Sequence, residues 1–209
     1  MSTKRTPAKW ANPIRAWRRH LRDERVIKEW RASGSPVPPP SALKQQVVRA
    51  YAAQFGLQTL VETGTFKGDM IHAVEREFKE VHSIELGRDL YEEAGRRFAG
   101  LSHVHLHHGD SATMLPEVLQ KLHSPALFWL DGHFSKGITA RGAKDTPIIE
   151  ELEAICRHKA KGHVILIDDA RCFTGTGDYP SIEELRRLAG ERAPGACFEV
   201  ADDIVRIHP

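Results

Sequence analysis

Short apolar stretches alternate with stretches of helical periodicity along most of this 209-residue sequence. Several apolar stretches are nearly continuous, as in "ALFWLD" and "HVILID", which is typical of parallel strands that are covered on both faces. Five strand-helix units in succession predict an α/β fold with a doubly wound, mostly parallel, Rossmann-like sheet. The predicted strands are 57–62, 81–86, 103–108, 126–131 and 163–168, and the predicted helices are 68–79, 88–99, 112–123, 145–159 and 181–190.

The two ends of the sequence depart from this alternation. The last segment, "ACFEVADDIVRIHP", has two strand-like runs with no helix between them, which predicts an antiparallel hairpin that closes the sheet. Residues 33–41, "SGSPVPPPS", contain three consecutive prolines, which cannot lie inside a helix and favour an extended spacer. We therefore predict a helical arm and linker over residues 1–38 and one domain over residues 39–209. Ser41 is the predicted N-cap of that domain's first helix, 42–55.

The predicted arm is strongly basic. Residues 1–31 contain ten Lys or Arg and three acidic residues, and Ile14, Trp17 and Leu21 recur at helical spacing. These features predict an amphipathic helix whose apolar side packs on the domain or on a second subunit, as in a homodimer. The alternative is a contact between the arginines and nucleic acid or an anionic membrane surface.

Composition narrows the class of protein. Hydrophobic residues make up 41% and charged residues 28% of the chain, which is ordinary for a globular protein. No apolar run approaches the roughly 20 residues that span a bilayer, and the N-terminus has no apolar segment of the kind found in secretory signals. The three cysteines are odd in number and lack metal-binding spacing. They predict free thiols in a reducing compartment, so we expect a cytoplasmic protein without a membrane span.

A carboxylate stands at or just after the C-terminal end of each predicted parallel strand. Ligands of an open α/β sheet bind outside the carboxyl ends of its strands, and a carboxylate is unfavourable to bury without a partner. Acids at all five strand ends therefore predict a binding site along one edge of the sheet, although each acid alone could be a turn residue or a helix cap. They are Glu62, Glu85, Asp110, Asp131 and the pair Asp168 and Asp169.

The segment "ETGTFKG", residues 62–68, lies between the first predicted strand and a predicted helix. Gly64 and Gly68 let the backbone turn sharply and approach a ligand, next to the free N–H groups of a helix N-terminus. The spacing matches neither a P-loop nor a dinucleotide-binding fingerprint. Glu62-x-Gly64-x-x-x-Gly68 resembles the first motif of class I S-adenosylmethionine-dependent methyltransferases, whose fuller pattern has a third glycine where this sequence has Phe66.

The resemblance implies S-adenosyl-L-methionine as the cofactor. It places Glu62 near the methionine amine and Asp110, in "HHGDS", beside the adenine amino group. It places Glu85 at the ribose hydroxyls, and Glu85 follows Gly64 by 21 residues, close to the roughly 20 expected of such an acid. The cofactor-binding residues that it predicts are Glu62, Gly64, Thr65, Phe66, Gly68, Glu85, Asp110 and Ser111.

The remaining strand-end acids predict a metal site. Asp131, Asp168 and Asp169 come from neighbouring strand ends, and three carboxylates can converge on one hard cation, Mg²⁺ or Mn²⁺. The arrangement resembles that of metal-dependent O-methyltransferases, and most of all the macrocin and aminocoumarin type that methylates sugar hydroxyls of natural products. The alternative is that Asp168 caps the following loop and Asp169 is solvated.

Methyl transfer to a hydroxyl group needs an activated oxygen. A neutral hydroxyl is a poor nucleophile, and a divalent cation held in part by Asp131 would lower the pKa of the hydroxyl and fix its position. His133 is predicted as the catalytic base, because an imidazole titrates near neutral pH. The alternative is that His133 only packs or hydrogen-bonds. The polar loop 134–146 is predicted to be either a lid over the site or a solvated loop.

These features predict an S-adenosylmethionine-dependent, magnesium-dependent O-methyltransferase that acts on a hydroxyl of a small molecule, such as a sugar or another natural product. Two alternatives stay open. The basic arm suggests a nucleic-acid methyltransferase, although no Asn/Asp-Pro-Pro-Tyr/Phe-type tetrapeptide follows the fourth predicted strand. The departure at Phe66 is compatible with a catalytically silent cofactor-binding module that recruits a partner through its arm.

Overall fold

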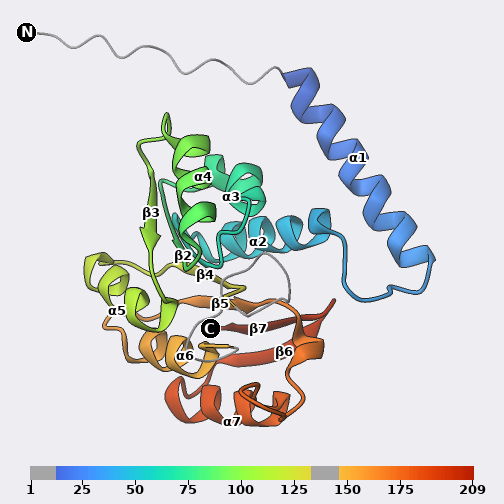
Figure 1. Ribbon diagram of the computed structural model, residues 1–209. Helices are drawn as coiled ribbons and strands as arrows, with labels where there is room; N and C mark the ends of the chain where they lie inside the picture. The colour runs from blue at the N-terminus through green and yellow to red at the C-terminus, as the bar shows by residue number, and fades with distance from the viewer. Residues whose placement is uncertain (1–12, 133–145) are drawn as a thin grey trace, which may run out of the picture.

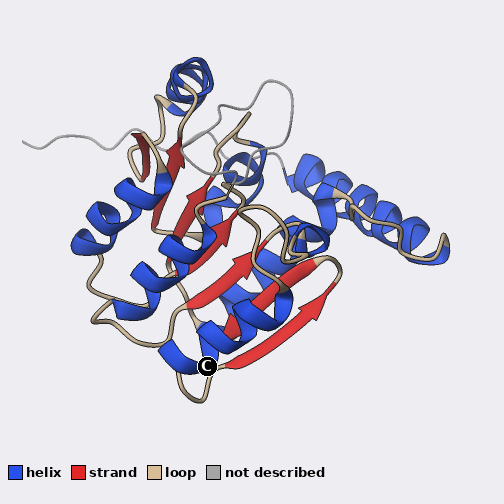
Figure 2. Cartoon of the chain, turned by 60° about the horizontal axis from the view of Figure 1, so that its bottom comes forward, coloured by secondary structure: helices blue, strands red, loops and turns tan. Residues whose placement is uncertain are grey.

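A seven-stranded mixed sheet forms the centre of the molecule (Figures 1 and 2). The structure, a computed structural model, describes residues 13–132 and 146–209, with side chains described from residue 17 onward. The strand order is β3-β2-β1-β4-β5-β7-β6; β1 to β5 are parallel, and β7 is antiparallel to β5 and to β6. The predicted α/β fold and its C-terminal hairpin are confirmed. The strands are β1 (Thr59–Thr63), β2 (Glu80–Glu85), β3 (Val104–His108), β4 (Leu127–Leu130), β5 (Val164–Ile167), β6 (Cys197–Ala201) and β7 (Ile204–His208).

The order of the parallel strands reverses between β1 and β4. The chain builds β1, β2 and β3 outward in one direction and then returns to place β4 on the other side of β1. Thr63, the last residue of β1, pairs with Ile84 of β2 and with Leu130 of β4. The loops that follow these three strands therefore start at the same edge, at the switch point where doubly wound sheets bind ligands.

Helices cover both faces of the sheet, so the molecule has three layers (Figure 1). On one face lie α2 (Ser41–Phe55), α3 (Asp69–Val74) and α4 (Arg88–Phe98), and on the other lie α5 (Ser111–Lys121), α6 (Ile148–Arg157) and α7 (Ile182–Arg192). Two short 3₁₀ helices, η1 (Glu75–Glu77) and η2 (Ala170–Cys172), follow α3 and β5.

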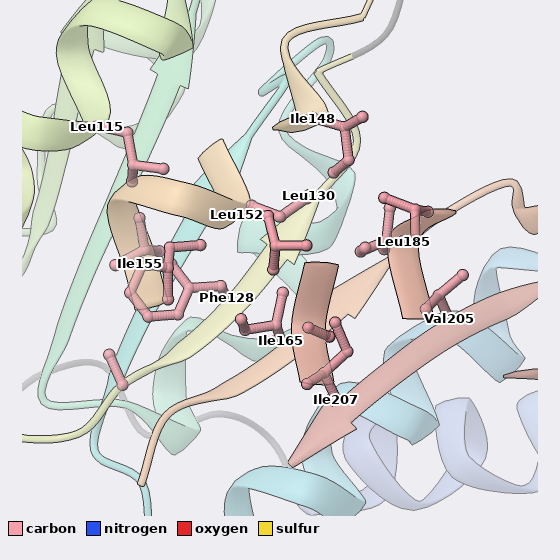
Figure 3. Close-up of a cluster of buried hydrophobic side chains, with 14 of the residues drawn as sticks. Leu115, Phe128, Leu130, Ile148, Leu152, Ile155, Ile165, Leu185, Val205 and Ile207 are labelled. Atoms are coloured by element: carbon pink, nitrogen blue, oxygen red, sulfur yellow. The ribbon is translucent and has the colours of Figure 1, made fainter. Parts of the chain in front are cut away.

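Each face of the sheet has its own apolar core. Side chains alternate along a strand, so Phe128 and Leu130 of β4 join the core under α5, α6 and α7, while Trp129 joins the core under α2, α3 and α4. Figure 3 shows the first of these cores, in which Phe128 lies beside Ile155 of α6. Because all four residues of β4 are buried, this strand reads as a continuous apolar run rather than an alternating one.

Several predicted element boundaries needed correction. Ser41 does not cap α2: the helix begins at Ser41 itself, after Pro40, and has no side-chain cap. The predicted helix 68–79 ends as an α-helix at Val74 and continues only as the 3₁₀ turn η1. The helix predicted over 145–159 begins at Ile148, directly after Pro147 at the N-cap position, and ends at Arg157.

The basic arm is helical, as its periodicity predicts, and α1 (Pro13–Ala32) projects from the domain in Figure 1. Its last turns are attached: Ile27 is buried, and Trp30 Nε1 donates a hydrogen bond of 2.7 Å to the Pro36 carbonyl in the linker. Trp17 is 61% exposed, so this tryptophan does not pack on the domain, and packing on a second subunit stays a prediction. None of the described helices combines the length and apolar composition that crossing a bilayer requires.

Candidate active site

The loops after β1 and β4 touch at the switch point, and Gly64 makes the contact possible. Gly64 has a φ of +82°, and a Cβ atom at this position would lie 2.4 Å from the Asp131 carbonyl oxygen. Gly68 has a φ of +72°, and a Cβ atom at this position would lie 2.5 Å from the ring of Phe98 on α4. The predicted sharp turn is present, and both glycines have a packing reason in addition to the ligand approach that the motif implies.

Glu62 lies at the centre of a buried polar network. Ser83 Oγ donates a hydrogen bond of 2.5 Å to Glu62 Oε2, and the hydroxyls of Ser83 and Thr65 are 2.6 Å apart. The Glu62 side chain is almost fully buried. Burial, together with the nearby carboxylates of Asp131 and Glu85, raises the pKa of Glu62 to about 8, against the opposing effect of the Ser83 hydrogen bond.

Glu85 holds the glycine turn in place. Its Oε2 accepts a hydrogen bond of 2.7 Å from the Phe66 N–H, and its Oε1 accepts one of 2.8 Å from the Gly87 N–H. Phe66 takes a left-handed φ of +49°, which costs a non-glycine residue roughly 1–2 kcal/mol, and the residue is 38% exposed. Phe66 therefore adopts the backbone conformation that suits the glycine of the family motif, and Glu85 stabilises it.

Asp110 and Ser111 start α5 at the same edge. Asp110 is the N-cap, and its Oδ1 accepts a hydrogen bond of 2.9 Å from the Ala112 N–H. Ser111 is buried. A Cβ atom on Gly132 would lie 3.3 Å from Ser111 Oγ and 3.1 Å from Thr63 Oγ1, so the ends of β1, β3 and β4 converge here.

This convergence leaves a polar atom for a ligand. Thr63 Oγ1 is buried and has no hydrogen-bond partner among the residues that the structure describes. Buried hydroxyls are normally paired. Glu62 precedes Thr63 in β1 and Thr65 lies in the turn that follows, so this unpaired hydroxyl stands next to the Glu62 network in the sequence.

The acids after β5 are bound by lysine and arginine side chains. Lys44 Nζ, from the first turn of α2, lies 2.5 Å from Asp168 Oδ2 and 3.4 Å from Asp169 Oδ1. The other Asp168 oxygen accepts a hydrogen bond of 2.9 Å from the Asp169 N–H. Arg171 Nη1 lies 2.8 Å from the same Asp169 oxygen that Lys44 contacts. Asp168 is therefore not a simple loop cap, and Asp169 is not simply solvated.

Asp131 connects the two halves of the site electrostatically. Burial lowers the pKa of Lys44, but the carboxylates of Asp168, Asp169 and Asp131 outweigh burial and leave that pKa raised, so the ammonium is charged at neutral pH. The same Asp131 carboxylate helps to raise the pKa of Glu62. Glu62 near the end of β1, Asp131 after β4 and the acids after β5 thus lie along one continuous edge of the sheet.

The residues as arranged do not fit the predicted magnesium or manganese ion. Over residues 13–132 and 146–209, no three His, Cys, Asp or Glu side chains are placed to hold a metal ion. Three carboxylates would be a suitable donor set for such an ion, but the Lys44 ammonium contacts two of them. His133 and most of the loop 134–146, including the predicted base, lie outside the described residues.

The fold is shared with solved methyltransferases. The structure resembles the O-methyltransferase TomG from Streptomyces achromogenes, involved in tomaymycin synthesis and solved with S-adenosylmethionine, at 19% identity with a TM-score of 0.58, covering 88% of this chain and 87% of that one. An O-methyltransferase from Bacillus cereus, solved with S-adenosylhomocysteine, matches at 17% identity with a TM-score of 0.58, covering 90% of both chains. The methyltransferase PaMTH1 of Podospora anserina, also bound to S-adenosylhomocysteine, matches at 15% identity with a TM-score of 0.57, covering 98% of this chain and 99% of that one.

These likenesses define the class of fold: the chain has the architecture of the class I S-adenosylmethionine-dependent methyltransferases. At such identities the similarity shows the fold and not the reaction. No family model and no curated protein matches the sequence.

Proposed function

We propose that this protein is an S-adenosylmethionine-dependent methyltransferase that methylates a hydroxyl oxygen of a small molecule. The observation that carries the proposal is the convergence, at the switch point, of the glycine turn with the carboxylates of Glu62, Glu85 and Asp110. Two of the proteins that share this fold are O-methyltransferases, which supports the choice of oxygen as the methylated atom.

Each acid in this cluster has a proposed task toward the cofactor. Glu62 faces the amine, because a buried carboxyl with a raised pKa gains a partner when a cation arrives. Glu85 accepts hydrogen bonds from the ribose hydroxyls, and Asp110 and Ser111 bind the adenine end. The turn over Gly64, Thr65, Phe66 and Gly68 lies against the cofactor between these acids.

The bound cofactor supplies a methyl group on a sulfonium sulfur, which becomes a neutral thioether when the methyl leaves. The chain has to place the acceptor oxygen in line with that methyl and remove the acceptor's proton. We propose that Asp131 positions the acceptor, since it lies between the cofactor acids and the Lys44 group. His133 stays the predicted base. The predicted Mg²⁺ or Mn²⁺ ion has no part in this proposal, because it would have to displace Lys44 from Asp168 and Asp169.

A screen of hydroxylated small molecules tests this function. The full-length protein is incubated with S-adenosylmethionine that carries a deuterated methyl group, and mass spectrometry detects products heavier by one CD₃ group in place of hydrogen. Parallel reactions with magnesium and with a chelator test the metal prediction. Labelled sugars or other alcohols support the proposal. Labelling of RNA or DNA alone would instead support the nucleic-acid alternative, and cofactor binding without any labelling would support the silent module.

A further inference from the structure

Lys44 brings a positive charge to the strand-end acids from a distant part of the sequence. It lies in the first turn of α2, a helix whose Leu43, Val47 and Val48 are buried on the domain. The helix packs against β4 and β5, the strands that end just before Asp131 and Asp168. The ammonium is therefore carried by an element anchored in the core.

The ion pair between Lys44 and Asp168 is nearly excluded from water. The side chains are 17% and 2% exposed, and the two charged atoms are 2.5 Å apart. Exposed ion pairs contribute little to stability, but a buried carboxylate that loses its cation is strongly unfavourable. Asp168 therefore depends on the Lys44 charge.

The backbone after β5 brings both carboxylates to that charge. Consecutive side chains of an extended strand point to opposite faces, but Asp169 has a left-handed φ of +55° that breaks the strand. Both acids consequently reach Lys44 Nζ. Arg171 binds the Asp169 carboxylate as well, and it also contacts Asp203 in the turn before β7. These side chains form one connected charge network, in which the cations Lys44 and Arg171 already contact the carboxylates of Asp168 and Asp169.

We propose that the Lys44 ammonium supplies the positive charge on the acceptor side of this site, in place of a divalent cation, so that methyl transfer needs no metal. This role of Lys44 rests on the proposed function, which supplies the reaction. An ammonium has three N–H bonds. Within the described part of the chain, Asp168 and Asp169 accept two of them, which leaves one for the acceptor oxygen.

In the transfer step, the acceptor O–H bond breaks and its proton passes to a base. The O–CH₃ bond forms as the S–CH₃ bond of the cofactor breaks. The Lys44 charge stabilises the oxygen while its proton leaves, and a fixed charge in a water-poor site is effective because it needs no reorganisation.

Manganese binding tests the proposal without an acceptor. Mn²⁺ is titrated into the full-length protein, and the electron paramagnetic resonance signal of the free ion reports binding. We expect the parent not to bind Mn²⁺ at these acids. Lys44→Met keeps the side-chain length and removes the charge, so its Mn²⁺ affinity should rise about 100-fold or more, because a like charge a few Å from the ion is gone. The double variant Lys44→Met/Asp168→Asn should lose that gain.

Lys44→Arg is the matched control, because it keeps a cation and should exclude Mn²⁺ as the parent does. Tight Mn²⁺ binding by the parent that disappears in Asp168→Asn would overturn the proposal, and so would a folded Lys44→Met variant that gains no affinity. If Lys44→Met fails to fold, the titrations of the parent and of Lys44→Arg decide. S-adenosylhomocysteine binding is measured on the same preparations: its absence in the parent would contradict the proposed function while leaving the Mn²⁺ result intact.

Discussion

Replacing Glu62 by glutamine removes a buried carboxyl from the centre of the site and should make the free protein more stable at alkaline pH. The Glu62 side chain is 2% exposed, and its pKa is raised to about 8, first by burial and then by Asp131 and Glu85. A glutamine at this position keeps the shape of the side chain and an oxygen for the Ser83 hydroxyl, but it carries no charge at any pH.

The size and sign of the effect follow from the two pKa values. The folded protein holds the Glu62 proton up to about pH 8, whereas the unfolded chain releases it near 4.5. The contribution of this carboxyl to the unfolding free energy is therefore fully present below about pH 4.5 and is lost as the pH rises to about 8. Each pKa unit is worth about 1.4 kcal/mol, so the parent loses up to about 5 kcal/mol of unfolding free energy across that window, relative to a group that does not titrate.

Urea unfolding of the apo protein at pH values from 5 to 9 measures this difference. The unfolding free energy of Glu62→Gln should match that of the parent near pH 5 and exceed it by up to about 5 kcal/mol near pH 9. Glu92→Gln, on the surface of α4 beside Arg88, is the control and should follow the parent. Parallel pH profiles for the parent and Glu62→Gln would refute the assignment of a neutral buried carboxyl.

The same carboxyl couples proton release to cofactor binding. If the cofactor amine lies beside Glu62, binding favours the ionised carboxylate, and the protein releases a proton when it binds at pH 7. The affinity for S-adenosylhomocysteine should then rise between pH 6 and pH 8, by up to about tenfold per pH unit. Isothermal titration calorimetry in buffers of different ionisation enthalpy detects the released proton, and Glu62→Gln should show none from this site.

Three further substitutions and one deletion probe the surrounding structure. Gly64→Ala should lower the unfolding free energy by about 3 kcal/mol or more, because the new Cβ would meet the Asp131 carbonyl at 2.4 Å in a left-handed conformation; a loss under about 1 kcal/mol would show that the two loops move apart easily. Asp110→Ala and Ser181→Ala each remove a helix N-cap, and each should lower the unfolding free energy measured in urea by about 1 kcal/mol. Only Asp110→Ala should also weaken S-adenosylhomocysteine binding. Equal affinities of the two variants for this ligand would argue against an adenine contact. Deleting residues 1–38 should change that affinity less than about threefold, and a larger loss in a folded deletion variant would show that the arm completes the site.

The fold was predictable because its strands are buried on both faces. Parallel strands under two helical layers appear in the sequence as nearly continuous apolar runs, and β4 and β5 were located within one residue at each end. Boundaries set by a single backbone feature were harder. The end of α3 at Val74 depends on a local change to 3₁₀ geometry, which hydrophobic periodicity does not reveal.

The acids of the site were also predictable, because parallel topology alone brings strand ends to one edge. The hydrogen bonds of Glu85 to the Phe66 and Gly87 N–H groups were not, since they depend on the fold of a loop. Lys44 was missed because 124 residues separate it from Asp168. A signal did exist: Lys44 shares a helical face with Val47, Val48 and Tyr51, and a lysine on an apolar stripe needs a partner.

Binding of S-adenosylhomocysteine to the full-length chain tests the central claim most directly. Isothermal titration calorimetry should give one site per chain with a Kd between about 1 µM and 1 mM, the range common for enzyme substrates. Glu85→Ala should weaken binding by about 10- to 100-fold, as expected when a charged hydrogen-bond acceptor is removed, with circular dichroism confirming that the variant is folded. Glu92→Gln should bind as the parent does. Absence of binding at millimolar ligand, or undiminished affinity in folded Glu85→Ala, would contradict a cofactor site at the carboxyl edge of this sheet.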